Sequence, residues 1–184
     1  PDENITLDYE HDLSLQALNN LQLALKAFYN QVLIVSKEVY PKDFLKMTPM
    51  IFSLHTWVGY DVDGRGDISW ADTFNKRLKV KLGQLKNYED SINGIGLKVS
   101  GDKNLNRIII EIKKILSESI ESNTKIFDTI AEKGFIKNTN SIKKISKFMF
   151  DNQRKLLVNS EEIFNLVEKL SEAINQSKIK RKQD

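Results

Sequence analysis

The chain has 184 residues, no cysteine, 40% hydrophobic and 29% charged residues, and a formal net charge of +3. This composition is typical of a soluble globular protein, and it excludes disulfides, thiolate catalysis and zinc sites built from cysteine. The nearly balanced charge gives no electrostatic case for nucleic acid. No apolar run approaches the roughly 20 residues that a membrane span needs. We therefore expect a cytoplasmic protein with no nucleic-acid or membrane partner.

Long stretches without proline or glycine predict four long helices, because only three prolines and eight glycines occur. The first helix carries apolar residues at intervals of three and four, which predicts a single apolar stripe. That stripe consists of Leu18, Leu21, Leu25, Phe28, Val32 and Val35. The four helices are predicted at about 11–39, 70–92, 103–133 and 141–176.

One segment, 50–57, is predicted to form a β-strand. It is short and rich in aromatic and branched residues, and it lies between Pro49 and Gly59. A single strand cannot satisfy its own backbone groups, so it needs a partner from outside this sequence. The sequence also begins at Pro1 without an initiator methionine. We expect a processed chain or an excerpt from a longer one.

Helix boundaries are marked by capping residues and glycines. Ser69 followed by Asp72 has the spacing of a capping box, which predicts a helix start at residue 70. Gly94, Gly96 and Gly101 are predicted to break that helix, which is expected to end near residue 92. Gly134 is predicted to end the next helix as a left-handed residue.

The residues that could take part in binding or catalysis are concentrated in the segment 59–67. It holds three aspartates, one arginine and three glycines: Gly59, Asp61, Asp63, Gly64, Arg65, Gly66 and Asp67. Glycine lets a backbone approach a ligand closely. Carboxylates and a guanidinium can fix one another's geometry and hold an anionic substrate. A loop that follows a strand is also where α/β barrels place their active sites.

These residues resemble a known family. Phosphoenolpyruvate carboxylases carry a Gly-Gly-Asp-Arg-Asp-Gly-Asn-Pro loop after an aromatic strand that ends in Ser-Trp. The residues that match in register are Trp57, Gly59, Asp61, Asp63 and Gly64. Downstream residues look like an alphaproteobacterial-type branch of the family, namely Asp67, Ile68, Ser69, Trp70, Thr73, Arg77, Leu78, Lys81, Gln84 and Leu85. The resemblance covers about 50–86.

The loop departs from the family pattern at one position. The family's arginine between the two aspartates is a substrate-site residue, and Val62 stands there in this chain. Arg65 is the candidate to supply the positive charge instead. The family's catalytic histidine belongs to a His-Pro-Thr-Glu-like motif that this chain lacks, and His55 is not in that context. We therefore expect no catalytic residue and no metal ligand here, only a substrate-binding loop of Trp57, Gly59, Asp61, Asp63, Gly64 and Arg65.

The resemblance implies a mainly α fold with one barrel-type strand, as a single helical segment, 1–184, of a TIM-barrel-like enzyme. It implies a carboxy-lyase that forms oxaloacetate and phosphate from phosphoenolpyruvate and bicarbonate, in anaplerotic carbon fixation. The expected cofactor is Mg²⁺, with its ligands outside this chain. The expected partners are the remainder of the enzyme and further copies in a homo-oligomer. This chain alone is expected to be inactive.

Two alternatives stay open. The loop resembles an EF-hand, since Asp61, Asp63, Gly66, Ile68 and Asp72 fall at positions one, three, six, eight and twelve. Arg65 at position five and the strand-like incoming segment disagree with calcium binding. The other alternative is a helical scaffold or interaction domain without a site. Such a bundle would leave 50–57 helical or buried, whereas an excerpt of a barrel leaves its edges unpaired.

Overall fold

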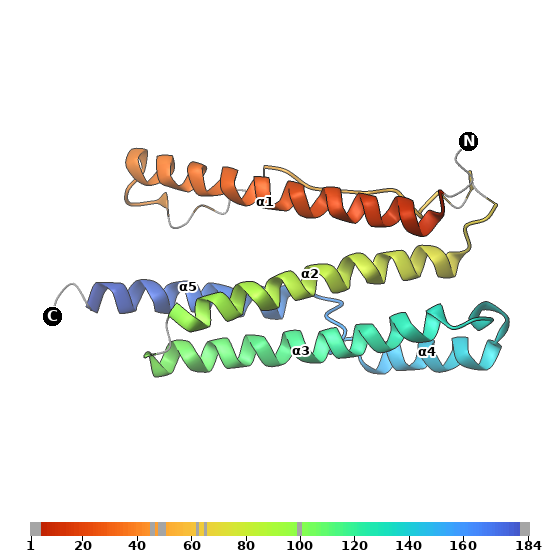
Figure 1. Cartoon of the computed structure of the whole chain (residues 1–184). Coiled ribbons are helices and arrows are strands. Elements are labelled where there is room, and N and C mark those ends of the chain that lie inside the picture. Colours follow the sequence, from red (N-terminus) through yellow and green to blue (C-terminus); the bar gives the residue numbers. More distant parts are fainter. Residues whose placement is uncertain are drawn as a thin grey trace. The chain divides into compact units, whose positions relative to one another are not determined.

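The computed structural model describes residues 5–44, 47, 51–61, 63–64, 66–98 and 101–180. The described chain is mainly helical, as predicted (Figure 1). Its elements are α1 (Leu7–Val39), α2 (Trp70–Lys98), α3 (Lys103–Ala131), the 3-10 helix η2 (Phe135–Lys137), α4 (Thr139–Asp151) and α5 (Glu161–Lys180). The chain divides into two compact units, Pro1–Thr73 and Phe74–Asp184, with the boundary in the first turn of α2.

Helix α1 of the first unit begins at a capped end. The Thr6 hydroxyl accepts a hydrogen bond from the Tyr9 backbone N–H at 3.2 Å, which satisfies one of the free donors of the first turn. The predicted apolar stripe divides into two rows. Leu18, Leu25 and Val32 are half-buried, whereas the row formed by Leu21, Phe28 and Val35 is exposed. Helix α1 is therefore apolar over a wider arc than one stripe.

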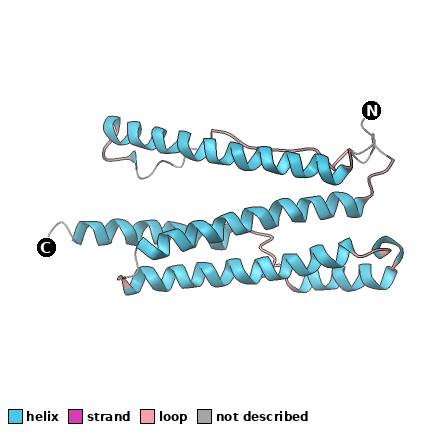
Figure 2. Ribbon diagram, viewed as in Figure 1, coloured by secondary structure: helices cyan, strands magenta, loops and turns pink. Residues whose placement is uncertain are grey.

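The predicted strand at 50–57 is not formed. Residues 51–57 carry neither helix nor strand (Figure 2), and Met50 lies outside the described residues. The Tyr29 hydroxyl accepts hydrogen bonds from the backbone N–H groups of Ile51 and Phe52, at 3.0 and 3.2 Å. The Phe52 ring packs edge-on against Phe28 at 5.7 Å. The segment thus lies along α1, because the described chain offers no second strand for it to pair with.

The second unit has a continuous apolar core between three helices. Its buried members come from α2 (Leu85 and Ile92), α3 (Leu105, Ile109, Ile112 and Leu116) and α5 (Leu166 and Leu170). Ile112 and Leu116 are fully buried. Burying a branched aliphatic side chain contributes about 1.5–3 kcal/mol relative to leaving it exposed. This core therefore holds the three helices together.

Helix α2 does not end at its glycines. It continues to Lys98, so the predicted break near residue 92 is wrong. A glycine inside a helix costs about 1 kcal/mol. Ile92 is buried in the core and Ile95 packs against it, and that burial offsets the cost. At Gly96 a Cβ atom would lie 3.5 Å from the side chain of Ile109, so α2 approaches α3 closely at that turn.

The single helix predicted at 141–176 is two helices. Helix α4 ends at Asp151 and α5 begins at Glu161. Leu157, in the connection, adopts a positive φ of 51°, which is strained for a residue with a Cβ. The Asn159 side chain accepts a hydrogen bond from the Glu161 N–H at 2.9 Å, which forms an Asx turn just before α5. Gly134, with φ of 87°, takes the left-handed conformation predicted for it, two residues beyond the C-cap Glu132 of α3.

Side chains from two helices hold this connection in place. The Lys81 ammonium donates hydrogen bonds to the carbonyls of Leu156 and Leu157, the latter at 3.2 Å. The buried Asn123 amide donates to the Leu156 carbonyl at 3.3 Å. Desolvation of the half-buried ammonium lowers the pKa of Lys81. The strained turn is thus fixed by donors from α2 and α3.

Among the described residues, no helix is both long enough and apolar enough to cross a lipid bilayer.

Replacing Lys81 with methionine tests this connection. Lys81→Met keeps the chain length but removes the ammonium donors, so we expect the free energy of unfolding to fall by about 1–2 kcal/mol. Burial lowers the pKa of Lys81 in the folded chain, so the unfolded chain binds more protons in the window just below the ordinary lysine pKa. The free energy of unfolding of the wild-type chain therefore rises as the pH rises through that window. The difference in the free energy of unfolding between the wild type and Lys81→Met increases with it. Denaturant titrations at several pH values measure both effects.

The matched control is Lys86→Met, at an exposed position of the same helix. It should leave the free energy of unfolding nearly unchanged. Equal stabilities for Lys81→Met and Lys86→Met would contradict the role of the ammonium.

Candidate functional site

The first unit places a tight turn at the start of the predicted loop. The Tyr60 N–H donates to the Trp57 carbonyl at 2.9 Å, which closes a β-turn over 57–60. Gly59, the third residue of the turn, has a φ of 88°. Positive φ at that position is the requirement of a type II turn, and glycine meets it without strain. The local reason for Gly59 is therefore backbone geometry.

Two contacts anchor the loop to the first turn of α2. The Thr73 hydroxyl donates to the Gly59 carbonyl at 2.8 Å. The Asp72 carboxylate accepts from the Ser69 N–H at 2.8 Å and from its hydroxyl at 2.5 Å, and the Asp72 N–H donates back to the Ser69 hydroxyl at 3.3 Å. This reciprocal pattern confirms the predicted capping box. Both ends of the loop are thus held by the residues that begin α2.

Asp61 and Gly64 are close neighbours within the loop. A Cβ atom at Gly64 would lie 2.6 Å from one carboxylate oxygen of Asp61, so any larger residue there would displace the Asp61 side chain. Gly64 therefore leaves the space that this carboxylate occupies. A steric contact thus explains why the loop has a glycine at position 64 beside Asp61.

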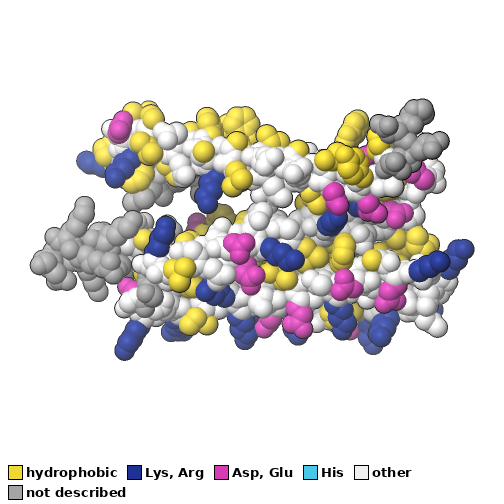
Figure 3. All heavy atoms as spheres, in the orientation of Figure 1, with side chains coloured by type: hydrophobic (Ala, Val, Ile, Leu, Met, Phe, Trp, Pro, Cys, Tyr) yellow, Lys and Arg dark blue, Asp and Glu magenta, His cyan; other side chains and the backbone are white. Residues whose placement is uncertain are grey.

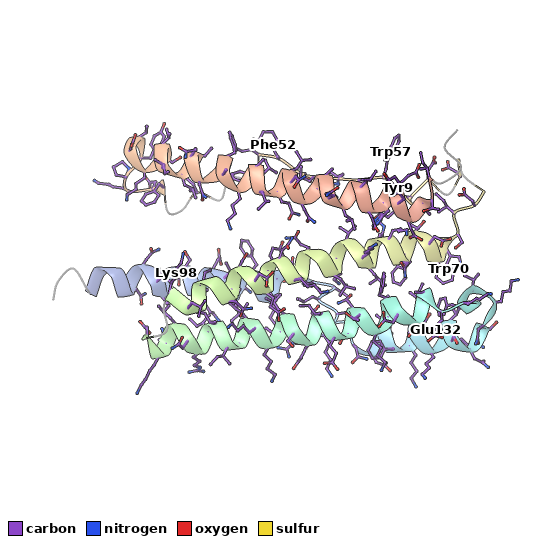
Figure 4. The ribbon with its side chains drawn as sticks, in the orientation of Figure 1. Tyr9, Phe52, Trp57, Trp70, Lys98 and Glu132 are labelled. Atoms are coloured by element: carbon purple, nitrogen blue, oxygen red, sulfur yellow. The ribbon has the colours of Figure 1, made fainter. Side chains whose placement is uncertain are left out.

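A surface hollow of about 310 Å³ lies between the loop and the start of α1. Its apolar lining comes from Leu7, Val58 and Ile68, and its two carboxylates are Glu10 and Asp61. The backbone turn at Gly59 and the side chain of Trp57 complete it. Trp57 is 83% exposed, so its ring forms an open rim. Figure 4 shows Phe52 and Trp57 along the segment that runs beside α1.

The charge of this hollow limits what it can bind. Its described lining includes two carboxylates and no lysine or arginine. A phosphate-bearing molecule needs a cationic or N–H-rich partner, so these residues do not form a phosphate site by themselves. Any anion held here would depend on a cation from elsewhere.

The structure brings together only part of the predicted site. Trp57, Gly59 and Asp61 share the hollow, whereas Asp63 and Gly64 are exposed and do not line it. Val62 and Arg65 lie outside the described residues. His55 is exposed and its Nε2 atom is 2.7 Å from the Ser53 hydroxyl.

Sequence reasoning missed two residues of the hollow, Leu7 and Glu10. They lie at the start of α1, more than forty residues before the loop. The hydrogen bonds from Ile51 and Phe52 to Tyr29 attach the segment before the loop to α1. No local pattern in the sequence predicts that this segment lies along α1.

The described residues do not form a metal site. No group of three or more histidine, cysteine, aspartate or glutamate side chains is arranged to hold an ion within the described part of the chain. Asp72, the last position of the EF-hand pattern, instead caps α2 through Ser69. Residues 51–57 also lack the incoming helix that an EF-hand needs. The described residues therefore form no site for Mg²⁺ or Ca²⁺.

The second unit has a separate hollow of about 280 Å³ beside α3. Its charged lining residues are three acids and three bases: Glu111, Glu118, Glu162, Lys114, Arg154 and Lys155. Arg154 Nε donates to Glu162 at 3.0 Å. This hydrogen bond raises the pKa of Arg154 and lowers the pKa of Glu162. Because the charges balance, the hollow gives no net attraction for an ion of either sign.

Comparisons with known proteins do not place the chain in a family. No protein-family model matches it, and no curated protein and no solved structure is similar to it.

The turn at 57–60 can be tested with two glycine substitutions. Gly59→Ala introduces a Cβ at a φ of 88°, so we expect the free energy of unfolding of the first unit to fall by about 1–2 kcal/mol. Gly66→Ala is the matched control, because no atom lies within 4 Å of its Cβ position. Hydrogen exchange of the amides in 51–61 would report the loss locally. Equal protection in the two variants would show that the turn does not depend on Gly59.

Proposed function

We propose that this chain is a helical, loop-bearing segment of a phosphoenolpyruvate carboxylase-type enzyme. The complete enzyme would join phosphoenolpyruvate to bicarbonate and release oxaloacetate and phosphate. Support comes from the in-register residues between Trp57 and Gly64. The segment after them, from Asp67 to Leu85, adds to it.

The observation that carries the proposal is the state of residues 51–57. A self-contained helical bundle would make this segment helical or bury it, but it is neither. Ile51 and Phe52 are each 55% exposed and Trp57 is 83% exposed. An exposed aromatic segment next to a Gly/Asp loop is compatible with a barrel strand that lacks its neighbours. This favours an excerpt of a larger enzyme over a complete scaffold domain.

The residues of the loop would position an anion rather than react with it. Arg65 is the proposed cation for the phosphate or carboxylate of the substrate. Asp61 and Asp63 would hold the loop and its guanidinium in place. The carboxylates of the hollow make an anion there unfavourable without such a cation. The type II turn at Gly59 and the capping box of α2 would hold the two ends of the loop in place, and this would lower the entropy lost when substrate binds.

The remaining parts of the site would come from the rest of the enzyme. The proposal places the catalytic histidine and the Mg²⁺ ligands outside this sequence. Mg²⁺ would supply electrostatic stabilisation of developing negative charge. A cytoplasmic location and a homo-oligomeric state belong to the same proposal.

The decisive experiment is an assay of the native gene product. Its length would be determined, and bicarbonate-dependent formation of oxaloacetate from phosphoenolpyruvate would be measured with magnesium. A product several times longer than this chain and active in that assay supports the proposal. A product that ends near Asp184 and is inactive overturns it.

Arg65 and Val62 form a matched pair for testing the site in the complete enzyme. Loss of a charge-assisted hydrogen bond costs about 1.5–3 kcal/mol, so we expect Arg65→Ala to lower kcat/KM by about 10- to 100-fold. Val62→Ala, at the position of the family arginine, should have little effect. Steady-state kinetics with phosphoenolpyruvate as the varied substrate measure both. Unchanged kinetics for Arg65→Ala would remove its role in binding the anion.

A further inference from the structure

The connection between α4 and α5 has the hydrogen-bond pattern of a helix end. The Leu157 N–H donates to the Arg154 carbonyl at 3.0 Å. The Val158 N–H donates to the Gln153 carbonyl at 3.2 Å. Together with the φ of 51° at Leu157, these two bonds form a Schellman motif. The left-handed position of that motif usually holds glycine, because a Cβ atom is strained there. Here it holds leucine, so the break carries a backbone cost that glycine would avoid.

The break is stabilised by contacts between the connection and the rest of the second unit. The side chain of Leu157 packs against the core. The Lys81 ammonium donates to the carbonyls of Leu156 and Leu157. In a continuous helix the same two carbonyls would accept from the N–H groups of Ser160 and Glu161, which follow them by one helical turn. The Lys81 ammonium therefore occupies acceptors that a continuous helix would use.

The sequence is compatible with a helix that runs through the break. Residues 139–180 contain neither glycine nor proline. The spacing from Ile145 to Ile163 equals about five turns of 3.6 residues, so the two side chains would share one line of such a helix. The buried or partly buried side chains that fall near this line are Ile145, Leu156, Ile163, Leu170 and Ile174. The apolar stripe thus keeps its phase across the connection.

The charged residues of this stretch fall on the other side of the same helix. At 100° per residue, each lysine, arginine, aspartate and glutamate between 143 and 172 lies roughly 80° or more from the line through Ile145. Figure 3 shows charged side chains crowded along the edge of the second unit that α3 and α4 form. Leu157 would lie about 120° from the line, among these charges. A continuous helix would therefore move Leu157 from the core to the polar side.

Helices α4 and α5 already follow α3 in the order that a single antiparallel helix would need. In the second half of α3, the Lys125 ammonium lies 4.8 Å from the centre of the Phe148 ring of α4. Nearer the middle, Asn123 donates to the Leu156 carbonyl of the connection. Helix α5 shares the core with the first half of α3. A straight helix could thus remain along α3 without detaching α5.

We infer that the α4–α5 connection is a two-state element, in which the broken form is in equilibrium with one continuous helix. The Lys81 ammonium and the packing of Leu157 favour the broken form. Helical hydrogen bonds and relief of the strain at Leu157 favour the continuous form. The two forms differ in the exposure of both groups, so a ligand or partner that binds either group in one form would shift the equilibrium. The inference rests on the second unit alone and does not depend on the proposed enzyme.

Two substitutions of Leu157 separate the forms, because both remove its side chain from the core. Leu157→Gly relieves the left-handed strain and disfavours a helix, so it should keep the break. Leu157→Ala keeps the strain and has the highest helix propensity. We expect the ratio of continuous to broken form to be at least tenfold larger in Leu157→Ala than in Leu157→Gly.

The backbone Cα chemical shifts of 152–160 in the whole chain measure that ratio by NMR. The methyl signals of Ile112 and Leu116 report that the core is intact in each variant. Helical shifts without interruption in Leu157→Ala support the inference. The same interrupted pattern in Leu157→Ala and Leu157→Gly overturns it.

Lys81→Met tests the inference with Leu157 in place, and it decides the matter if Leu157→Ala fails to fold. Removing the ammonium leaves the two carbonyls to the helical N–H groups, so we expect the ratio of continuous to broken form to rise about tenfold. Hydrogen exchange at the Ser160 and Glu161 amides should slow accordingly. Lys86→Met, at an exposed position of the same helix, is the control and should change neither quantity. An unchanged connection in Lys81→Met overturns the two-state assignment.

Discussion

The start of α2 is the constraint on which the candidate site depends. The Asp72 carboxylate is bonded to Ser69, and the Thr73 hydroxyl to the Gly59 carbonyl. The Ser69–Asp72 contacts satisfy N–H groups that a helix end leaves free. The Thr73 contact holds the turn at 57–60. Later turns of the same helix contribute Leu85 and Ile92 to the core of the second unit. One helix thus holds the loop at its beginning and joins the core further on.

Two uses of the same aspartates can be compared with this arrangement. In an EF-hand, Asp61, Asp63 and Asp72 would converge on one ion. Here the Asp72 carboxylate accepts hydrogen bonds from the Ser69 N–H and hydroxyl. The Asp61 carboxylate lies over Gly64. Two of the three aspartates therefore have local roles in turn and cap, which needs no ion.

The sequence was most informative where one physical effect dominated locally. Apolar periodicity located α1, α2 and α3 to within a few residues at most ends, and the spacing of Ser69 and Asp72 located a helix start. It failed where tertiary contacts decided. The glycines of α2 are tolerated because Ile92 and Ile95 pack on the core. The break after α4 depends on Lys81 and Asn123, which are distant in sequence. A local signal was present there, since Asn159 and Ser160 precede two glutamates and the Asn159 side chain forms an Asx turn with the Glu161 N–H.

The strand prediction at 50–57 failed for a different reason, because a β-strand is stable only when it pairs with another strand. Its composition suits a strand, but the described chain offers only the Tyr29 hydroxyl to its first two N–H groups. Helix α1 shows the same deficit, because its two adjacent apolar rows form one wide arc and the row of Leu21, Phe28 and Val35 is exposed. Both features indicate surface that this sequence does not cover by itself.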